Sequence, residues 1–394
     1  MSEQGFTTRA IHTAHFHGAT PGDAISFPIF QTSSFDFAST DAIDQLHDPD
    51  IKSFAYSRAS NPTVDAFERT LAALEGATAA CAFASGMAAI HAAMLAVVGA
   101  GHHLVVTRDV YGGSYHLLKD ILPRLGISHT LVDMTDLAAT AAAMRPETRM
   151  VWAETISNPT TTVLDIPALA ELAHAHGALL GVDATFTTPY LSLPLAQGAD
   201  LVAHSATKYI SGHGDVIAGV VAGSTAMLAP VRDLMIGVGG SMAPLEAFLL
   251  LRGLKTLELR MDRHNTTAQR VAEMLDAHPI VETVFYPGIA SHPQHALARR
   301  LYPRGFGGLL SFTVRGDETM ARAVVDRLKL FLRAGSLGDA HSLVSLPVMM
   351  SHHHLTPEDR AASRVTPNLI RVPIGLENSD DIVADLQQAL DGVA

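Results

Sequence analysis

The segment HSATKYISGHGD, at residues 204–215, holds the densest group of side chains that could do chemistry. Ser205 and Thr207 are two positions apart, so both hydroxyls point the same way on an extended segment. Lys208 follows directly and is one of only five lysines, the others being Lys52, Lys119, Lys255 and Lys329. The two hydroxyls could bind a phosphate, and the amine beside them could react with a carbonyl group. Pyridoxal phosphate carries both a phosphate and such a carbonyl. A surface lysine beside a glycine turn is the commoner alternative, but the scarcity of lysine and the apolar run before the segment favour the cofactor.

Such a cofactor needs a buried acid, because its pyridinium nitrogen must stay protonated to withdraw electrons. Asp183 ends the apolar run ALLGVD, where an unpaired acid would be costly to bury. A helix cap or a turn aspartate is the alternative for this residue. The run SGMAA at 85–89 follows a predicted strand and opens a predicted helix, so its free amides could hold the phosphate. An ordinary turn between strand and helix would look the same.

The elements that must position these residues alternate between short apolar runs and helical patterns. Strands are predicted at 78–84, 103–107, 128–134, 149–154, 178–184 and 200–206, and helices at 85–98, 111–122, 135–144 and 167–177. Unbroken apolar strands between helices predict an α/β fold, with a mainly parallel sheet that helices flank on both faces. Because crossovers are right-handed, the loops that follow the strands should share one functional edge.

Three regions are predicted along the chain. Residues 1–60 show little helical periodicity and are expected to form an extended N-terminal arm that contacts a neighbouring subunit. Residues 61–255 are expected to form the cofactor-binding domain, which opens with a helix that Asn61 caps and Gly76 stops. Residues 256–394 are expected to form a smaller α/β C-terminal domain. Its predicted elements are a strand at 308–314 and helices at 318–331 and 379–390.

Composition excludes several classes of function. Hydrophobic residues make up 48% of the 394 residues and charged residues 17%, which indicates a folded protein with a large core. The net charge of −12 repels phosphate backbones, so no nucleic-acid partner is expected. The single cysteine, Cys81, excludes an intrachain disulfide. The N-terminus does not resemble a signal peptide, and the longest apolar stretch, 86–101, is too short for a bilayer. We therefore expect a cytoplasmic enzyme with no membrane partner.

Two other kinds of site are disfavoured by the spacing of their residues. The run His352–His354 invites a metal interpretation, but adjacent side chains on a strand or loop point in different directions. No metal is expected, although one of these histidines could line a pocket. An NAD-linked oxidoreductase would need G-x-G-x-x-G after the first strand, and the glycines of SGHGD and GVGGS do not have that spacing or context.

Several separated motifs together resemble one family. They are YSRASNPT (56–63), ASGMAAI (84–90), YGGSY (111–115), ETISNPT (154–160), VDATFTTPYL (182–191), HSATKYISGHGD (204–215), RGLKTLELRMDRH (252–264), SLGDAHSLV (336–344) and LIRVPIGLE (369–377). The chain resembles the Cys/Met-metabolism group of pyridoxal-phosphate (PLP) enzymes, from about residue 7 to 392. This group includes cystathionine γ-lyase, methionine γ-lyase, cystathionine γ-synthase and the O-acylhomoserine sulfhydrylases. The resemblance implies the fold type I of PLP-dependent transferases and PLP as the cofactor.

The resemblance also implies which residues hold the cofactor. Lys208 resembles the lysine that forms the Schiff base, and Asp183 the partner of the pyridinium nitrogen. The phosphate is expected to contact Ser205, Thr207, Gly86 and Met87. Tyr56 and Arg58 resemble a pair that reaches the same phosphate from the neighbouring subunit. This would make a dimer the minimal active unit, with two dimers paired in a tetramer.

Further residues are implied in catalysis and in substrate binding. Tyr111 resembles the tyrosine that stacks on the cofactor ring and is a candidate acid and base. Asn158 resembles the side chain near the phenolic oxygen of the cofactor. Arg371 matches the arginine that binds the substrate α-carboxylate, a task for which its planar fork is suited. Ser336 resembles the serine at the same clamp, and both Asn158 and Tyr56 are expected to contact the substrate.

The implied reaction is γ-elimination on a methionine-like or cystathionine-like amino acid, which gives an α-keto acid, ammonia and a thiol. The freed amine of Lys208 would remove the α-proton, and a second abstraction at Cβ would allow the group on Cγ to leave, with Tyr111 as its proton donor. The alternative is γ-replacement on an O-acylhomoserine, as in cystathionine γ-synthase or the sulfhydrylases. Loss of Lys208, Asp183 or Arg371 would mark a non-catalytic member, and all three are present.

Five positions depart from the family pattern and affect the choice of substrate. Gly335 stands where cystathionine-handling members carry a glutamate, and Gly113 where methionine γ-lyases show a cysteine. His116 stands where cystathionine enzymes often have an arginine, and it is either a weak anion contact or a surface histidine. Ala184 replaces an asparagine, and Met235 with Ile236 replaces a Lys-Asp pair at the pocket mouth. These departures predict a pocket that is neutral at its distal end and favours a short, uncharged γ-substituent.

Overall fold

The computed structural model describes residues 4–14, 24–48, 53–351, 360 and 363–393. Its larger body is built on a seven-stranded sheet in the order β1-β7-β6-β5-β4-β2-β3. The strands are β1 (Ala79–Phe83), β2 (His103–Thr107), β3 (Ser128–Val132), β4 (Thr148–Glu154), β5 (Leu179–Asp183), β6 (Leu201–His204) and β7 (Gly219–Gly223). Only β7 runs antiparallel to its neighbours, so the predicted mainly parallel α/β sheet is confirmed. The sequence did not predict β7, which inserts between β1 and β6.

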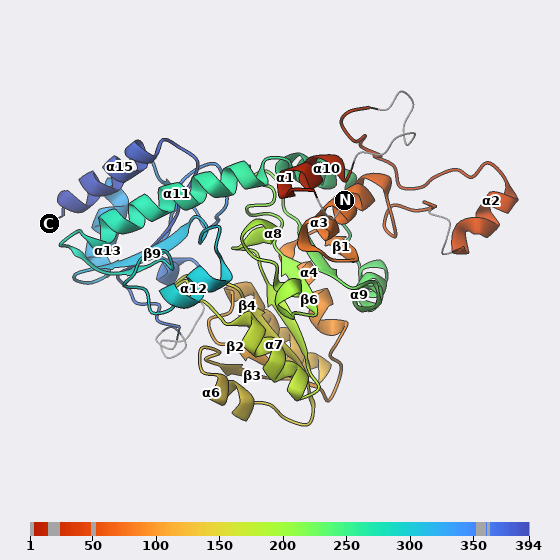
Figure 1. Ribbon diagram of the computed structural model, residues 1–394, viewed down its shortest axis with the longest axis horizontal. Coiled ribbons are helices and arrows are strands. Elements are labelled where there is room, and N and C mark those ends of the chain that lie inside the picture. Colours follow the sequence, from red (N-terminus) through yellow and green to blue (C-terminus); the bar gives the residue numbers. More distant parts are fainter. Residues whose placement is uncertain (1–3, 15–23, 49–52, 352–359, 361–362, 394) are drawn as a thin grey trace.

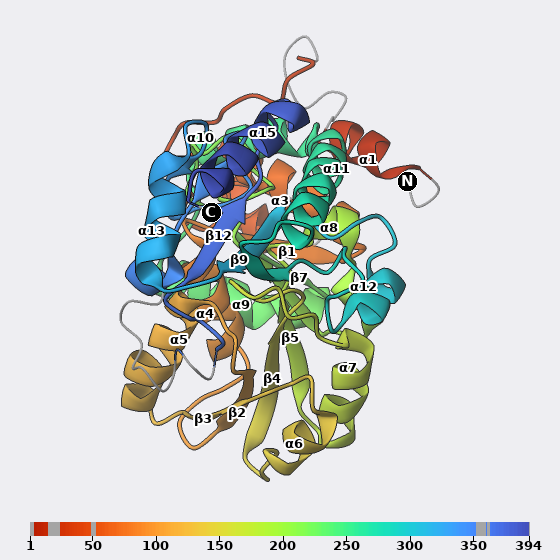
Figure 2. The same cartoon turned by 90° about the vertical axis from the view of Figure 1, so that its left-hand side faces the viewer.

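Helices cover both faces of this sheet, as Figures 1 and 2 show. On one face α4 (Gly86–Leu95) and α9 (Thr225–Val238) pack on apolar side chains such as Val106 and Trp152. On the other face α7 (Ile166–Ala175) covers the central strands. A third apolar cluster joins α3 (Pro62–Glu75) and α10 (Pro244–Leu254) to the edge of the sheet at β1 and β7. The remaining short elements are α5 (Gly112–His116), η2 (Leu117–Ile121), η3 (Leu122–Leu125), α6 (Leu137–Ala142), α8 (Thr188–Leu191) and η4 (Pro194–Gln197).

The ends of α3 follow from its sequence, as predicted. The side chain of Asn61 accepts a hydrogen bond from the Thr63 amide at 2.9 Å, and Pro62 occupies the first helical position. Gly76 ends the helix with φ of 71°, and its amide donates to the Ala72 carbonyl.

A smaller body follows α10 and has its own apolar core. The helix α11 (Leu257–Asp276) runs from the larger body along this core, as Figure 1 shows. The antiparallel strands are ordered β12-β9-β8, with α13 and α15 packed beside them. The elements are β8 (Val281–Phe285), α12 (His295–Leu301), β9 (Leu309–Val314), α13 (Glu318–Arg327), β10 (Leu332–Arg333), β11 (Leu343–Val344), η5 (Pro347–Met349), β12 (Leu369–Pro373) and α15 (Ser379–Asp391). The helix predicted at 318–331 ends earlier, at Arg327, since Leu328 has extended backbone angles.

The N-terminal region contains two helices, α1 (Phe6–His12) and α2 (Thr40–Asp44), with the single turn η1 (Gln45–His47) after them. The sequence predicted little helix there. Helix α1 is held by tertiary contact, since the Phe6 ring lies edge-on to the Tyr190 ring with centroids 5.2 Å apart. The segment that carries α2 extends away from the rest of the molecule in Figure 1. Among the described residues, no helix is both long and apolar enough to cross a membrane.

Candidate active site

A cavity of about 690 Å³ lies where the carboxyl ends of β4, β5 and β6 face strand β12 of the smaller body. It is lined by most of the site residues that the sequence predicts, namely Gly86, Met87, Tyr111, Asn158, Asp183, Ser205, Thr207, Lys208, Ser336 and Arg371. These residues come from seven separate motifs. The parallel sheet brings the loops of five motifs to one edge, and the smaller body supplies Ser336 and Arg371.

Lys208 follows β6 in a turn, and its Nζ donates to Ser336 Oγ at 3.0 Å. Burial, together with the positive charge of Arg371, lowers the pKa of Lys208 to about 8. An amine with this pKa is neutral in about a tenth of molecules at pH 7, far more than an ordinary lysine, so it can act as a nucleophile and a base.

Two features hold the backbone around Lys208. The buried guanidinium of Arg260 donates to the carbonyls of Tyr209 at 2.6 Å and of Gly253 at 2.8 Å. Gly338, two residues after Ser336, lies against the turn, because an added Cβ would be 2.5 Å from the Tyr209 nitrogen. Arg260 belongs to the motif RGLKTLELRMDRH and Gly338 to SLGDAHSLV. Both motifs therefore contribute residues that hold the backbone around Lys208.

Asp183 is the last residue of β5 and is only 8% exposed. Its Oδ1 accepts a hydrogen bond from the Thr185 amide at 2.9 Å. Burial raises the pKa of Asp183, while the bonds from Thr185 and the positive charge of His204 oppose that rise. The Asp183 carboxyl therefore lies at the cavity wall, where Thr185 and His204 stabilise its charged form.

Glu154, the last residue of β4, also lines the cavity and was not assigned from the sequence. Its Oε1 accepts a hydrogen bond from the Tyr111 amide at 2.6 Å. Burial and the neighbouring Asp183 raise the pKa of Glu154 well above its ordinary range. The sequence pattern could have identified Glu154, because RMVWAE ends in an acid after an apolar run, as ALLGVD does at Asp183.

The start of α4 and the turn after β6 also line the cavity. Ser85 caps α4 by accepting from the Ala88 amide at 3.1 Å, and the amides of Gly86 and Met87 before it have no acceptor within the helix. Gly86 lies against Ser205, since an added Cβ would be 2.8 Å from Ser205 Oγ. Thr207 Oγ1 accepts from the Ala218 amide at 2.9 Å. A helix N-terminus and hydroxyls at close range suit an anion such as phosphate.

Arg371 on β12 and Asn158 carry polar atoms that the described residues leave unsatisfied. Arg371 is 4% exposed, and its Nη1 donates to the Ser336 carbonyl at 3.3 Å. Burial lowers the pKa of Arg371 to about 10. Among the described residues, Arg371 Nε and Asn158 Oδ1 have no hydrogen-bond partner. A buried guanidinium without an acid partner is a binding site for a carboxylate.

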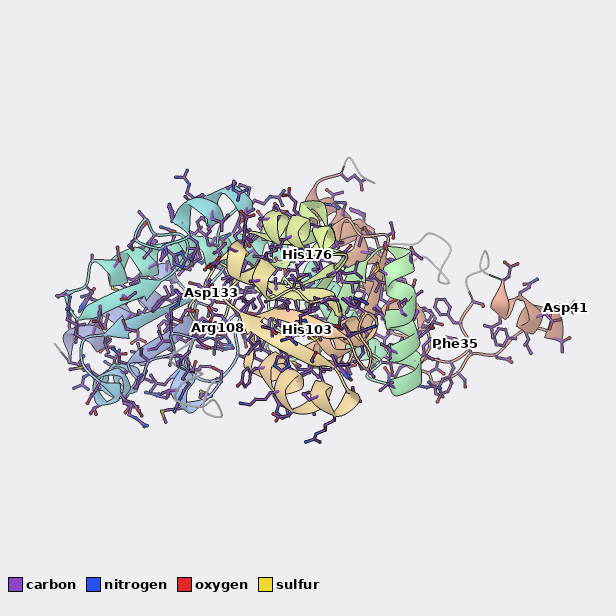
Figure 3. The ribbon with its side chains drawn as sticks, turned by 90° about the horizontal axis from the view of Figure 1, so that it is seen from below. Phe35, Asp41, His103, Arg108, Asp133 and His176 are labelled. Carbon is purple, nitrogen blue, oxygen red and sulfur yellow. The ribbon has the colours of Figure 1, made fainter. Side chains whose placement is uncertain are left out.

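Tyr56 and Arg58 do not line the cavity of their own chain. They lie at the base of the projecting N-terminal segment, where the Arg58 guanidinium stands 5.7 Å from the centre of the Tyr56 ring. Arg58 also donates to the carbonyl of Ile236. Figure 3 shows the same segment, marked by Phe35 and Asp41, reaching away from the body.

Two positions that depart from the family pattern lie beside the cavity. His116 and Gly113 line a neighbouring hollow, which shares Tyr111 and Met350 with the cavity. His116 Nδ1 lies 2.8 Å from Asp120 Oδ2, so this histidine already pairs with a carboxylate of the chain. At Gly113 an added Cβ would lie 2.6 Å from the Tyr111 ring, so a larger residue there would require the ring to shift. Ile217, Met349 and Met350 make the mouth apolar. His352–His354 lie outside the described residues. Among the residues that the structure describes, no cluster of metal-ligating side chains occurs.

Comparison with known proteins gives concordant matches. The profile of the Cys/Met metabolism PLP-dependent enzyme family matches residues 7–391. The L-methionine gamma-lyase of Pseudomonas putida is 43% identical over 98% of this chain and 97% of that protein. The chloroplastic cystathionine gamma-synthase 1 of Nicotiana tabacum is 41% identical over 94% of this chain and 69% of that protein. A putative O-acetylhomoserine (thiol)-lyase from Campylobacter jejuni subsp. jejuni has a crystal structure that contains a pyridoxyl-lysine phosphate. It superposes with a TM-score of 0.94 at 32% identity, covering 98% of this chain and 100% of that one.

Proposed function

Because this chain belongs to the Cys/Met metabolism PLP-dependent enzyme family, we propose that it catalyses PLP-dependent γ-elimination on a methionine-like amino acid. The products are an α-keto acid, ammonia and a thiol. The observation that carries the proposal is that one cavity holds both Lys208, with its lowered pKa, and the buried Arg371, whose Nε has no partner among the described residues.

The residues of the cavity fit the cofactor. Within the described part of the chain, Asn158 Oδ1 is buried without a partner, and Asp183 lines the same cavity, where it would meet a ring nitrogen. Gly86 lies against Ser205, and the first amides of α4 would donate to a phosphate beside Ser205 and Thr207. When bound there, PLP supplies an electron sink for the charge left after a proton leaves the substrate α-carbon.

The remaining steps fall to side chains of this chain. Arg371 would hold the α-carboxylate of the substrate with its planar fork, which orients the α-proton toward Lys208. Lys208 would take that proton at Nζ, and Ser336 would steady the amine through the hydrogen bond at 3.0 Å. Loss of a second proton, from Cβ, would allow the group on Cγ to leave, and Tyr111 would donate a proton to that group.

The mouth of the cavity supports a short, uncharged γ-substituent. The exposed side chains of Ile217, Met349 and Met350 give the cavity an apolar rim, against which a charged end group would be costly to bury. His116 lies in the neighbouring hollow and pairs there with Asp120. Gly335 leaves no side chain at a position that packs on Met350, since an added Cβ would be 3.2 Å from its Cε. The Pseudomonas putida relative carries the name L-methionine gamma-lyase, which agrees with a neutral thioether substrate.

Gamma-replacement on an O-acylhomoserine is the second candidate. It is supported by the Campylobacter jejuni neighbour, a putative O-acetylhomoserine (thiol)-lyase, and by the plant cystathionine gamma-synthase.

A substrate panel separates these candidates. The purified protein would be incubated with methionine, homocysteine, cystathionine, O-acetylhomoserine and O-succinylhomoserine, each with and without added thiol. Keto acid and ammonia formed without thiol support elimination, whereas a thioether formed only with thiol supports replacement. The Lys208→Ala variant is the control and should be inactive in both cases. A wild-type protein that neither shows visible cofactor absorption nor binds added PLP would refute the assignment.

We also infer that a dimer is the active unit and that two dimers pair in a tetramer. The support is the projecting segment, which carries Tyr56 and Arg58 away from their own cavity. The division into regions 1–60, 61–255 and 256–394 is part of the same proposal, supported by the break between α10 and α11. A cytoplasmic location stays a prediction from composition, which cell fractionation would check.

A further inference from the structure

Two buried acids end adjacent strands at the floor of the cavity. Glu154 closes β4 and Asp183 closes β5, and the two residues are register partners across the parallel pair. Glu154 is 5% exposed and Asp183 is 8% exposed, and both line the cavity. Among the described residues, neither carboxyl forms an ion pair with a lysine or an arginine. Two buried carboxyls at neighbouring positions oppose each other's ionisation, because each negative charge raises the cost of the other.

The surroundings decide which of the two carries the proton. Asp183 receives hydrogen bonds from Thr185 and feels the positive charge of His204, which lies on β6. Glu154 receives one hydrogen bond, from the Tyr111 amide, and faces two acids, Asp183 on β5 and Asp109 after β2. Both sets of neighbours favour an ionised Asp183 and a protonated Glu154.

We propose that Glu154 is a positioning residue that stays protonated, anchors the backbone of Tyr111 at the cavity wall, and leaves the negative charge of the pair to Asp183. The proposal rests on the roles proposed for Asp183 and Tyr111. Tyr111 is 44% exposed and directly precedes the short helix α5, so packing alone does not fix its position. The 2.6 Å bond from its amide to Glu154 ties that turn to the end of β4.

The protonation state can be tested without any turnover. Infrared difference spectra between the wild-type holoenzyme and Glu154→Gln at neutral pH should show one protonated carboxyl band that the variant lacks, with a shift in D₂O. Absence of that band would overturn the proposal, because the carboxyl would then be ionised. This result does not depend on which amino acid the enzyme converts.

Cofactor affinity provides a second test. Gln is neutral and keeps an oxygen that can accept from the Tyr111 amide, so Glu154→Gln should bind PLP within about threefold of wild type. Asp183→Asn removes the charge that meets the ring nitrogen and should weaken PLP binding by about tenfold or more. Equal losses in both variants would mean that the charge of Glu154 is needed, and would refute its neutral role.

The positioning of Tyr111 needs its own readout. Glu154→Ala should lower kcat by about tenfold, and Glu154→Gln should recover most of that loss. In a Tyr111→Phe background the backbone amide remains but the hydroxyl is gone, so Glu154→Ala should cost little more. Additive losses in this double-mutant cycle would show that Glu154 does not act through Tyr111. If no substrate of the panel is converted, the proposed function is refuted. The infrared and PLP-affinity measurements still test whether Glu154 is protonated, because they need no turnover.

Discussion

At the scale of single residues, burial sets the chemistry of the cavity. The amine of Lys208, the guanidinium of Arg371 and the carboxyl of Asp183 are all withdrawn from water, and each responds in the direction that weakens its charge. The shift matters most for Lys208, because only its neutral form can bond to a carbonyl carbon or take a proton.

The pH dependence of cofactor uptake follows from this shift. Burial and the charge of Arg371 lower the pKa of Lys208 from 10.5 to about 8, so the amine is protonated below that value and neutral above it. The rate at which the apoenzyme attaches PLP should therefore rise with pH and level off above about 8. Stopped-flow absorbance across this range would measure it, with Lys208→Ala as the variant that attaches none. A rate that keeps rising toward pH 10 would contradict the lowered pKa.

The geometry of Arg371 predicts that lysine cannot replace it. A lysine keeps the charge but loses the planar fork that meets a carboxylate with two hydrogen bonds. Arg371→Lys should lower kcat/KM by about 10- to 100-fold, mostly through KM. The same change at Arg263, an exposed arginine of α11 that donates to the Glu377 carbonyl, is the matched control. Steady-state kinetics of the two variants would decide, and similar losses would refute the proposed contact.

Among the structural elements, the loop after β10 packs closely against the turn after β6. Gly338 has φ of 74°, and an added Cβ would meet the backbone of Tyr209 at 2.5 Å and of Lys208 at 2.9 Å. Ser336 in the same loop accepts from Lys208 Nζ, so this contact sets the lysine in the cavity.

A pair of glycine substitutions isolates this contact. Gly177 has a similar φ of 69° but no atom within 4 Å of an added Cβ. Gly177→Ala should cost only the strain of a left-handed backbone, about 1 kcal/mol. Gly338→Ala should cost more stability and also weaken PLP binding, because the loop must move away from Lys208. Thermal melts with PLP titrations would measure both, and equal effects at the two sites would contradict the close packing.

The sequence predicted those features of the fold that are encoded locally. Apolar runs predicted six of the seven strands of the large sheet, and the acid at the end of ALLGVD predicted Asp183. Strand β7 was missed because GVVAG is short, rich in glycine and alanine, and buried on both faces, so it has no periodicity. Helix α1 was missed because the contact of Phe6 with Tyr190 spans most of the larger body in sequence. Glu154 was overlooked although it carries the same strand-end signal as Asp183.

At the scale of the whole molecule, the cavity of one chain lacks the two arm residues that the family resemblance assigns to it. Tyr56 and Arg58 sit on the segment that leaves the body, and the partly exposed Tyr56 packs beside Arg58 rather than in the cavity. Since a two-fold dimer exchanges identical surfaces, the arm of each chain would complete the site of the other.

Mixed dimers test this exchange. Lys208→Ala and Arg58→Ala should each be strongly impaired alone, the first in its own cavity and the second in the cavity of its partner. In a mixed dimer, the chain with intact Lys208 receives the intact Arg58 of the other chain, so one complete site forms. After co-refolding in equal amounts, half the dimers are mixed and each has one intact site of two, so activity should recover to about a quarter of wild type. Recovery would fail if Arg58 served its own chain, because both sites of every mixed dimer would then carry a defect.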